Sequence, residues 1–386
     1  MNNALSQSPD GACRTCLAIV LAAGESSRMR SARPKVLHEL AGRSMLAHVL
    51  SSLVEAGAGR IVVVAGVNHD AITAEAKTIV PDAELAIQKE RLGTAHAVLA
   101  ARGAIGRGYD DLLVVFADTP LVRPETYAAM RRALAGGQNA IAALGFEAAD
   151  PAGYGRFILE NGALKAIREE RDASEAERKI KMCNAGLMAL DGCHALALLE
   201  AIGNANSQNE YYLTDAVAVA RSRGFAVAAA ITAADEVIGV NDRAQLAAAE
   251  AALQARLRAN AMRDGATLID PSSVTLAFDT RLGRDVVVEP HVVFGPGVSV
   301  GEGSRIRAFS YLEGTATGQN AVVGPFARLR PGTSLAQDVH IGNFVEVKAA
   351  DVGPGAKINH LSYIGDASIG ARTNVGAGTI TCNYDG

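Results

Sequence analysis

Apolar runs and helical patterns alternate along the first two thirds of the chain. The apolar runs have the length of buried strands and predict strands at residues 16–21, 61–65, 111–116 and 139–144. The stretches between them carry helical spacing near residues 44–56, 70–79, 94–104 and 124–135. This alternation predicts an α/β domain built on a Rossmann-like, mainly parallel sheet. A ligand site is expected at the carboxyl ends of such strands.

The hydrophobic pattern of the last third repeats every six residues. A helix cannot keep a six-residue period on one face, and a plain strand repeats every two residues. Hexads therefore predict a parallel β-helix, in which each large apolar residue points inward and each coil stacks on the one before it. The repeating positions include Leu276, Leu282, Val288, Phe294, Val300, Ile306, Leu312, Val323, Leu329, Leu335, Ile341 and Val347.

The change of pattern divides the chain into four predicted segments. Residues 1–15 are expected to form a disordered tail, and residues 16–240 the first domain. Residues 241–265 are rich in Ala, Leu, Arg and Glu and predict one connector helix. Residues 266–386 form the predicted β-helix domain. Because a chain of 386 residues is too long for one compact core, two domains are expected.

Composition and charge narrow the class of protein. The chain is 49% hydrophobic and 20% charged, which is typical of a globular protein. Its net charge of −4 argues against nucleic acid or an anionic membrane surface as a partner. No apolar run is long enough to span a bilayer. The five cysteines are scattered, and the pair Cys13 and Cys16 has no matching second pair, so free thiols and a cytoplasmic location are expected.

The first predicted strand opens into a small, basic loop, LAAGESSRMRSARPKVL, at residues 21–37. Gly24 allows a tight turn close to a ligand, and Ser26 and Ser27 offer hydroxyl groups. Arg28 and Lys35 bring two positive charges, and both side-chain types bind phosphate oxygens. The loop therefore indicates a phosphate site, and the alternative is a solvated basic surface loop.

A carboxylate stands just after another strongly apolar strand, in the stretch FADTPLV at residues 116–122. Asp118 would face the same crevice as the basic loop if the two strands are neighbours. Mg²⁺ often binds through one or two protein groups together with substrate phosphates. Two basic residues and one Asp at adjacent strand ends therefore predict phosphoryl-transfer chemistry. The alternative for Asp118 is a helix cap or turn residue.

Seven motifs occur in one order along the first domain and resemble the sugar-1-phosphate nucleotidyltransferases. The loop at 21–37 and LAIQKERLGTAHAV at 85–98 resemble the nucleotide-binding motifs of that family. The later motifs are similar to the sugar-side motifs of bacterial uridylyltransferases: GYGRF at 153–157, AIREERDA at 166–173, CNAGLMAL at 183–190, NEYYLTDAV at 209–217 and IGVNDR at 238–243.

This resemblance implies a role for each matching residue. Arg28 and Lys35 would be catalytic, and Asp118 and Asn241 would hold Mg²⁺. The chain departs from the usual family pattern at Glu25, which would have to point away from the phosphates, and at Phe116-Ala117. Gln88, Gly93 and Thr94 would contact the base, and Gly155, Glu169 and Asn184 would bind the sugar phosphate. The full set that would bind UTP and the sugar phosphate is Leu21, Ala22, Ala23, Gly24, Lys35, Gln88, Gly93, Thr94, Gly155, Glu169, Asn184 and Asn241.

Motifs in the hexad region resemble a bacterial family that joins an N-acetylglucosamine-1-phosphate uridylyltransferase to a glucosamine-1-phosphate N-acetyltransferase. The motifs are GPFARLRPG, GNFVEVK, INHLSYIGDA and NVGAGTITCNYDG. The resemblance implies left-handed winding, a homotrimer, and acetyl-CoA as a co-substrate. Histidine is the side-chain type that commonly acts as a general base near neutral pH, so His360 is the implied base, although a lone His is also common on a β-helix surface. The resemblance also implies that Arg330 and Lys348 would hold the sugar phosphate. The other implied acetyl-transfer residues are Tyr363, Asn374, Ala377, Asn383 and Tyr384.

Together the motifs imply synthesis of UDP-N-acetylglucosamine, a precursor of cell wall and lipopolysaccharide, from small-molecule substrates. The sequence ends at Gly386 within the last motif, so the β-helix domain is expected to be incomplete and acetyl transfer impaired. Two alternatives stay open from the residues. One is another sugar-1-phosphate nucleotidyltransferase or a cytidylyltransferase. The other is a non-catalytic binding protein, because certain translation exchange-factor subunits share both halves.

Overall fold

A computed structural model describes residues 14–24 and 27–383, and the chain divides into two compact units. The first unit comprises residues up to His38 together with Ser44–Ala249. The second comprises Glu39–Arg43 together with residues from Glu250 onward. Cys13, Glu25, Ser26 and Tyr384 lie outside the described residues. Within the described part of the chain, no helix is long and apolar enough to cross a membrane.

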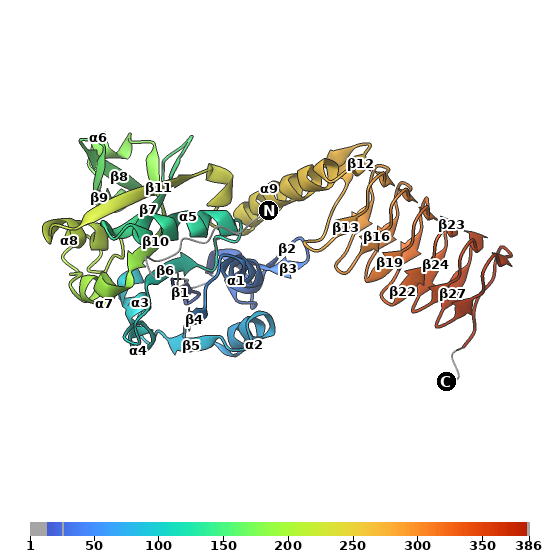
Figure 1. Cartoon of the computed structure of the whole chain (residues 1–386), viewed down its shortest axis with the longest axis horizontal. Coiled ribbons are helices and arrows are strands. Elements are labelled where there is room, and N and C mark those ends of the chain that lie inside the picture. The colour runs from blue at the N-terminus through green and yellow to red at the C-terminus, as the bar shows by residue number, and fades with distance from the viewer. Residues whose placement is uncertain (1–13, 25–26, 384–386) are drawn as a thin grey trace. The chain divides into compact units, whose positions relative to one another are not determined.

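Within the described residues, a nine-stranded sheet forms the centre of the first unit (Figure 1). Its main path runs β11-β7-β10-β6-β1-β4-β5, and β8 and β9 lie off this path. The strands are β1 (Cys16–Leu21), β4 (Arg60–Ala65), β5 (Glu84–Ile87), β6 (Asp111–Phe116), β7 (Asn139–Glu147), β8 (Gly155–Glu160), β9 (Ala163–Arg168), β10 (Met182–Asp191) and β11 (Ala226–Thr232).

The α/β class is confirmed, and the sheet is mixed where mainly parallel strands were expected. β1 pairs in parallel with β4 and β6, whereas β10 runs antiparallel to β6, β7 and β8. β8 and β9 form a hairpin whose turn is Asn161-Gly162, and both residues have positive φ, 52° and 79°. Asn-Gly is the preferred sequence for a two-residue hairpin turn. A hairpin therefore replaces a crossover helix in this half of the sheet, and this produces antiparallel pairing.

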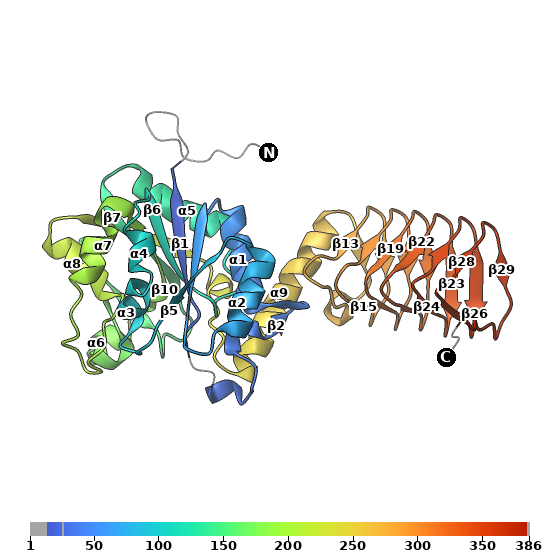
Figure 2. The ribbon, with the colours of Figure 1, turned by 90° about the horizontal axis from the view of Figure 1, so that it is seen from below.

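Helices cover both faces of this sheet (Figure 2). α1 (Met45–Glu55), α2 (Asp70–Ile79) and α5 (Pro124–Ala135) pack on one face. α3 (Thr94–Leu99), α4 (Arg102–Ile105), α7 (Gly192–Glu200) and α8 (Asp215–Ser222) pack on the other. β1 is buried on both faces because its alternate residues enter the two cores, which explains its continuous apolar run.

The helix predicted at 94–104 is two helices. Ala101, with φ −94° and ψ 19°, lies between α3 and α4 and interrupts the helical backbone. The smaller elements of the first unit are η1 (Ser27–Met29), η2 (Lys35–Leu37), η3 (Glu170–Asp172), α6 (Glu175–Arg178) and η4 (Ala234–Glu236). α9 (Arg243–Arg263) lies inside the range predicted for the connector helix.

In the described part of the second unit, three parallel sheets form the sides of a β-helix, as the hexads predict (Figure 2). One sheet holds β12 (Thr267–Leu268), β14 (Val287–Val288), β17 (Arg305–Ile306), β20 (Val322–Val323), β23 (His340–Asn343), β26 (Lys357–His360) and β29 (Asn374–Val375). A second holds β13 (Arg281–Leu282), β16 (Ser299–Val300), β19 (Thr315–Thr317), β22 (Thr333–Leu335), β25 (Asp351–Val352) and β28 (Ser368–Ile369). The third holds β15 (Val293–Phe294), β18 (Tyr311–Leu312), β21 (Arg328–Leu329), β24 (Glu346–Lys348) and β27 (Tyr363–Gly365).

The hexad residues form the core of the β-helix. Ile306, Leu312, Val323, Leu329 and Ile341 have no exposed surface and belong to one apolar cluster. Since each coil buries one such residue on each side, the period of six follows from the triangular coil.

A hairpin from the amino-terminal part of the sequence clusters with the second unit, which the hydrophobic pattern did not predict. Its strands are β2 (Glu39–Leu40) and β3 (Arg43–Ser44). The amide of Phe278 donates to the carbonyl of Ala41 at 2.9 Å, and the guanidinium of Arg43 lies 4.8 Å from the Phe278 ring centre. A β-carbon on Gly42 would lie 2.8 Å from the Pro296 side chain, so glycine permits this close packing.

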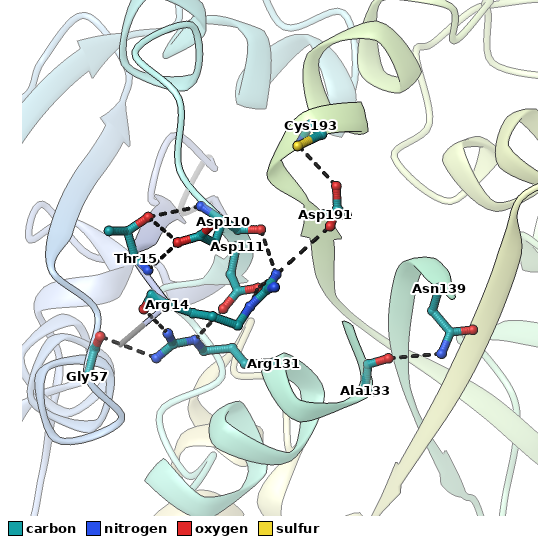
Figure 3. Close-up of polar contacts among 10 residues, drawn as sticks. All are labelled: Arg14, Thr15, Gly57, Asp110, Asp111, Arg131, Ala133, Asn139, Asp191 and Cys193. Atoms are coloured by element: carbon teal, nitrogen blue, oxygen red, sulfur yellow. Dashed lines mark hydrogen bonds and ion pairs between the residues drawn. The ribbon is translucent and has the colours of Figure 1, made fainter. Parts of the chain in front are cut away.

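A buried ion-pair network holds the amino end of β6 (Figure 3). The Asp111 carboxylate, with 1% of its side chain exposed, accepts from Arg14 at 2.6 Å and from Arg131 at 2.9 Å. Arg131 also donates to the carbonyl groups of Arg14 and Ala56. Next to it, the amide and hydroxyl of Thr15 donate to the Asp110 carboxylate and hold its pKa below the ordinary value.

We predict that Asp111→Ala lowers the free energy of unfolding of the first unit by about 3–5 kcal/mol, because the buried guanidinium of Arg131 loses its counter-charge. Glu200→Ala, which removes the exposed ion pair with Arg102, is the matched control. It should cost less than about 1 kcal/mol. Urea unfolding followed by circular dichroism measures both, and equal losses would show that burial of the network has no energetic consequence.

Candidate active sites

The predicted nucleotide site lies at the carboxyl ends of β1 and β6. These strands pair in parallel with Leu21 opposite Phe116, and the amide of Ala117 donates to the carbonyl of Leu21 at 3.0 Å. A pocket of about 250 Å³ opens there. Its lining residues are Leu21, Ala22, Ala23, Gly24, Lys35, Val36, Gln88, Gly93, Thr94, Ala97, Phe116, Asp118 and Glu210.

Lys35 connects the basic loop to the predicted metal ligands. Its ammonium lies 2.5 Å from Oδ2 of Asp118 and 3.0 Å from Oδ1 of Asn241. The Lys35 side chain is 7% exposed and that of Asp118 is 21% exposed. The amide of Val240 donates to the carbonyl of Asp118 at 2.9 Å, and this bond brings Asn241 beside the end of β6. The structure therefore gathers three predicted site residues around one point.

The segment predicted to contact the base is held by the segment around Tyr211. The amide of Ala95 donates to the carbonyl of Tyr211 at 2.9 Å, and the Thr94 hydroxyl accepts from the amide of Leu213 at 2.9 Å. Gly93 has φ +114°, and a β-carbon there would lie 2.5 Å from the Tyr211 carbonyl oxygen. The backbone approach at residue 93 therefore requires glycine.

The residues predicted to bind the sugar phosphate come from β8, β10 and the end of β9. Gly155 pairs with Asn184 in the antiparallel register. Glu169 accepts from the Thr214 hydroxyl at 2.9 Å. Burial raises the pKa of the Glu169 carboxyl, the Thr214 hydrogen bond opposes this shift, and the nearby Asp215 carboxylate adds to it. None of Gly155, Glu169 and Asn184 is among the described residues that line the 250 Å³ pocket.

Arg28 also lies apart from the pocket lining. It is exposed on η1, and it is not among the described residues that line the 250 Å³ pocket. Glu210 and Phe116 do line the pocket, although the motif comparison did not select them as site residues. Both residues lie inside motifs that the sequence analysis identified. The motifs alone do not show which of their residues line the pocket, because this depends on the tertiary structure.

Stacked coils position the predicted acetyl-transfer base. Asn343 and His360 occupy equivalent places on β23 and β26, and Oδ1 of Asn343 lies 2.9 Å from Nδ1 of His360. Sequence reasoning missed Asn343, and the signal that could have found it is the repeat, because 17 residues separate it from His360. An Asn oxygen at this place favours a proton on Nδ1 and leaves Nε2 free to accept one.

The predicted sugar-phosphate cations of the β-helix already have carboxylate partners. Arg330 pairs with Glu346 at 2.9 Å, and Lys348 pairs with Asp366 at 3.1 Å. The Asn383 side chain donates to the carbonyl groups of Gly365 and Asp366. Tyr363 begins β27, Asn374 begins β29 and Ala377 follows β29.

A groove of about 430 Å³ runs beside these residues, and Tyr363 is the one predicted acetyl-transfer residue that lines it in the described chain. Its other lining residues are Phe326, Arg328, Phe344, Val345, Glu346, Leu361, Ser362 and Ile380. The described part of one chain therefore does not gather Arg330, Lys348 and His360 into this groove.

One exposed ring from each of four successive coils forms a stack, here called the aromatic ladder. It consists of His291, Phe309, Phe326 and Phe344, with ring centres 4.9, 5.1 and 5.3 Å apart. The three Phe side chains are 45–56% exposed. All four residues have φ between 56° and 60°, an uncommon conformation for such residues. The three Phe rings therefore form a contiguous, exposed apolar stripe along the coils.

Comparisons with known proteins match both units. Residues 18–182 match the MobA-like NTP transferase domain, and residues 279–314 match the bacterial transferase hexapeptide (six repeats). The second match agrees with the left-handed β-helix expected from the motifs. The "Bifunctional protein GlmU" of Xanthobacter autotrophicus is 61% identical over 97% of this chain and 83% of its own length. The proteins of the same name from Azorhizobium caulinodans and Agrobacterium fabrum are 58% and 52% identical over 97% of this chain, covering 83% and 82% of their own lengths.

We predict that Gly93→Ala weakens UTP binding at least tenfold and lowers the thermal midpoint of the first unit, because the new β-carbon meets the Tyr211 backbone. Gly103→Ala is the matched control, since Gly103 lies in α4 with no atom within 4 Å of the added carbon. The control should keep UTP binding and stability unchanged or slightly increased. Isothermal titration calorimetry and differential scanning calorimetry measure both, and unchanged UTP affinity in Gly93→Ala would contradict the assignment of this turn.

Proposed function

The chain belongs to the family of the bifunctional protein GlmU, and from this premise we propose which of its residues carry the two activities. One activity transfers uridylyl from UTP to N-acetylglucosamine 1-phosphate and yields UDP-N-acetylglucosamine and pyrophosphate. The other transfers an acetyl group to the amine of glucosamine 1-phosphate. Both serve the synthesis of cell-wall and lipopolysaccharide precursors. We assign the first activity to the first unit and the second to the β-helix, which retains the predicted domains at 16–240 and 266–386.

The gathering of Gly24, Lys35 and Asp118 in one pocket supports the assignment of uridylyl transfer most strongly. A phosphate oxygen of N-acetylglucosamine 1-phosphate attacks the α-phosphorus of UTP, and the bond from this phosphorus to the bridging oxygen of pyrophosphate breaks. Lys35 neutralises triphosphate charge, and we assign Arg28 of the same loop to this role as well. Gln88, Gly93 and Thr94 bind the base, while Gly155, Glu169 and Asn184 bind the sugar phosphate. Positioning and electrostatic stabilisation supply most of the rate.

The donor groups at the pocket fit Mg²⁺. Asp118 and Asn241 offer a carboxylate and an amide oxygen, and hard oxygen donors are the ligands that Mg²⁺ prefers. The Lys35 ammonium contacts both oxygens, so the space between them already accommodates a positive charge. Mg²⁺ often binds through one or two protein groups together with waters and substrate phosphates, so phosphate oxygens of the substrates would supply further ligands. When bound, Mg²⁺ would neutralise the charge that develops on the phosphates.

For acetyl transfer we assign the general base to His360. An ammonium group is not a nucleophile, so the substrate amine must lose a proton before it attacks the thioester of acetyl-CoA. Nε2 of His360 accepts this proton, and Asn343 holds the ring by its contact with Nδ1. Arg330 and Lys348 bind the sugar phosphate, and Tyr363 and Asn374 orient the sugar. Ala377 and Asn383 lie toward the acetyl group, and Tyr384, outside the described residues, is assigned with them.

We assign the aromatic ladder to contact between copies of this chain in a homotrimer. The exposed rings of Phe309, Phe326 and Phe344 are apolar area that a second β-helix would bury. The 430 Å³ groove includes two of these rings, so a neighbouring β-helix would also close the groove beside Tyr363. Small-molecule substrates and further copies of the chain are the proposed partners, and a cytoplasmic location remains a prediction.

Asp118→Asn should lower uridylyl transfer at least 1000-fold while the chain stays folded at the assay temperature, because the amide keeps the shape and removes the charge. The thermal midpoint should fall, since the buried ammonium of Lys35 loses its counter-charge. Asp82→Asn, which removes an exposed carboxylate paired with Arg60, is the control and should keep full activity. The measurement is pyrophosphate release from UTP and N-acetylglucosamine 1-phosphate at saturating Mg²⁺. Near-normal turnover of Asp118→Asn would remove Asp118 from the metal site.

Phe326→Asp should shift the chain from trimer to monomer in analytical ultracentrifugation, since the charge would be buried in the centre of the aromatic ladder. Val67→Asp is the control, because Val67 is an apolar residue of the first unit and is 67% exposed. The control should sediment like the unchanged chain. A trimer of undiminished stability with Phe326→Asp would show that the ladder lies outside the contact between copies.

A further inference from the structure

The ammonium of Lys35 occupies the space between two oxygens assigned to the metal. It lies 2.5 Å from Oδ2 of Asp118 and 3.0 Å from Oδ1 of Asn241, and the side chain is almost fully buried. Charge-assisted contacts between nitrogen and a carboxylate oxygen usually measure about 2.7–2.9 Å, so this pair is close. Because the ammonium is shielded from water, its attraction to the carboxylate is stronger than that of an exposed pair.

A divalent cation would compete with Lys35 for this place. Both cations need the carboxylate of Asp118 and the amide oxygen of Asn241, and two positive charges repel at short range. Before a metal can bind these oxygens, the ammonium has to leave them. Because an unpaired buried charge is costly, the ammonium can leave the carboxylate readily only when another anion pairs with it.

The nucleotide supplies that anion in the same pocket. Lys35 lines the pocket together with Ala23 and Gly24 of the turn assigned to the phosphates. When the triphosphate enters, the ammonium can exchange the Asp118 carboxylate for a phosphate oxygen without losing a counter-charge. The exchange frees the oxygens of Asp118 and Asn241 at the moment when phosphate oxygens arrive to complete the ligand set.

We propose that Lys35 prevents a free divalent cation from binding at Asp118 and Asn241, and that it permits binding of the cation when the nucleotide is also bound. This inference rests on the proposed uridylyl transfer. Lys35 acts as a positioning residue before the nucleotide binds and as a phosphate ligand afterwards. Since coupling between two ligands is reciprocal, metal and nucleotide each increase the affinity of the chain for the other.

The test measures Mn²⁺ binding to the full chain by the electron paramagnetic resonance signal of free Mn²⁺, without any nucleotide. Lys35→Met keeps the length of the side chain and removes the charge, so it should bind Mn²⁺ at least tenfold more tightly than the unchanged chain. Lys77→Met, on the exposed side of α2, is the matched control and should bind Mn²⁺ like the unchanged chain. Lys35→Met combined with Asp118→Asn should lose the gained affinity, which locates the new site at Asp118. Circular dichroism establishes that each variant is folded, and Lys35→Gln serves if Lys35→Met is not.

A second titration repeats the measurement with UTP present and no sugar phosphate. UTP should increase the Mn²⁺ affinity of the unchanged chain, and the increase should be at least tenfold smaller in Lys35→Met. If the folded variants bind Mn²⁺ no better than the unchanged chain without UTP, the inference is overturned, while UTP binding by the unchanged chain still supports the proposed function. If the unchanged chain binds no UTP even with Mn²⁺, the proposed function fails and the inference fails with it.

Discussion

The parallel pairing of β1 with β6 is the constraint on which the proposed uridylyl site depends. With Leu21 opposite Phe116, the turn that follows β1 and the turn that follows β6 lie at one edge of the sheet. Lys35 and Asp118 meet there, although 83 residues separate them in the sequence. The buried pair of Asp111 with Arg131 holds the opposite end of β6. Small shifts of this strand would therefore move the carboxylate relative to the phosphate loop.

In the β-helix, the position of each side chain depends on the stacking of successive coils. Each coil stacks on the last in register, so residues one coil apart lie side by side. This single rule places Asn343 against His360 and stacks Phe326 on Phe344. The contact between Asn343 and His360 and the stripe of exposed rings thus arise from the same repeat. The left-handed positive-φ turns that carry the rings keep them outside the apolar core.

The elements with strong periodicity could be predicted from the sequence, often to the residue. β1, β6, α2 and α5 have the predicted bounds because each is a long apolar or amphipathic run with clear limits. The break at Ala101 was not predicted, because Ala100 and Ala101 both favour a helix. The hairpin at Asn161-Gly162 did have a signal, the dipeptide itself, and it explains the antiparallel strands. The hairpin at Glu39–Arg43 joins the second unit through tertiary packing that periodicity does not encode.

The residues of the candidate site could be predicted from the sequence, but the positions of their side chains relative to one another could not. Motif order identified Lys35, Asp118 and Asn241, whereas only the fold reveals that the ammonium lies between the two oxygens. Asn343 escaped notice because its role depends on register between coils. The most direct test of the account is a substrate panel with the unchanged chain, measuring pyrophosphate release. The account predicts release with UTP, N-acetylglucosamine 1-phosphate and Mg²⁺ together, and at least 100-fold slower release with CTP, with glucose 1-phosphate, or after chelation of the metal. Equal release with CTP or without a divalent cation would contradict it.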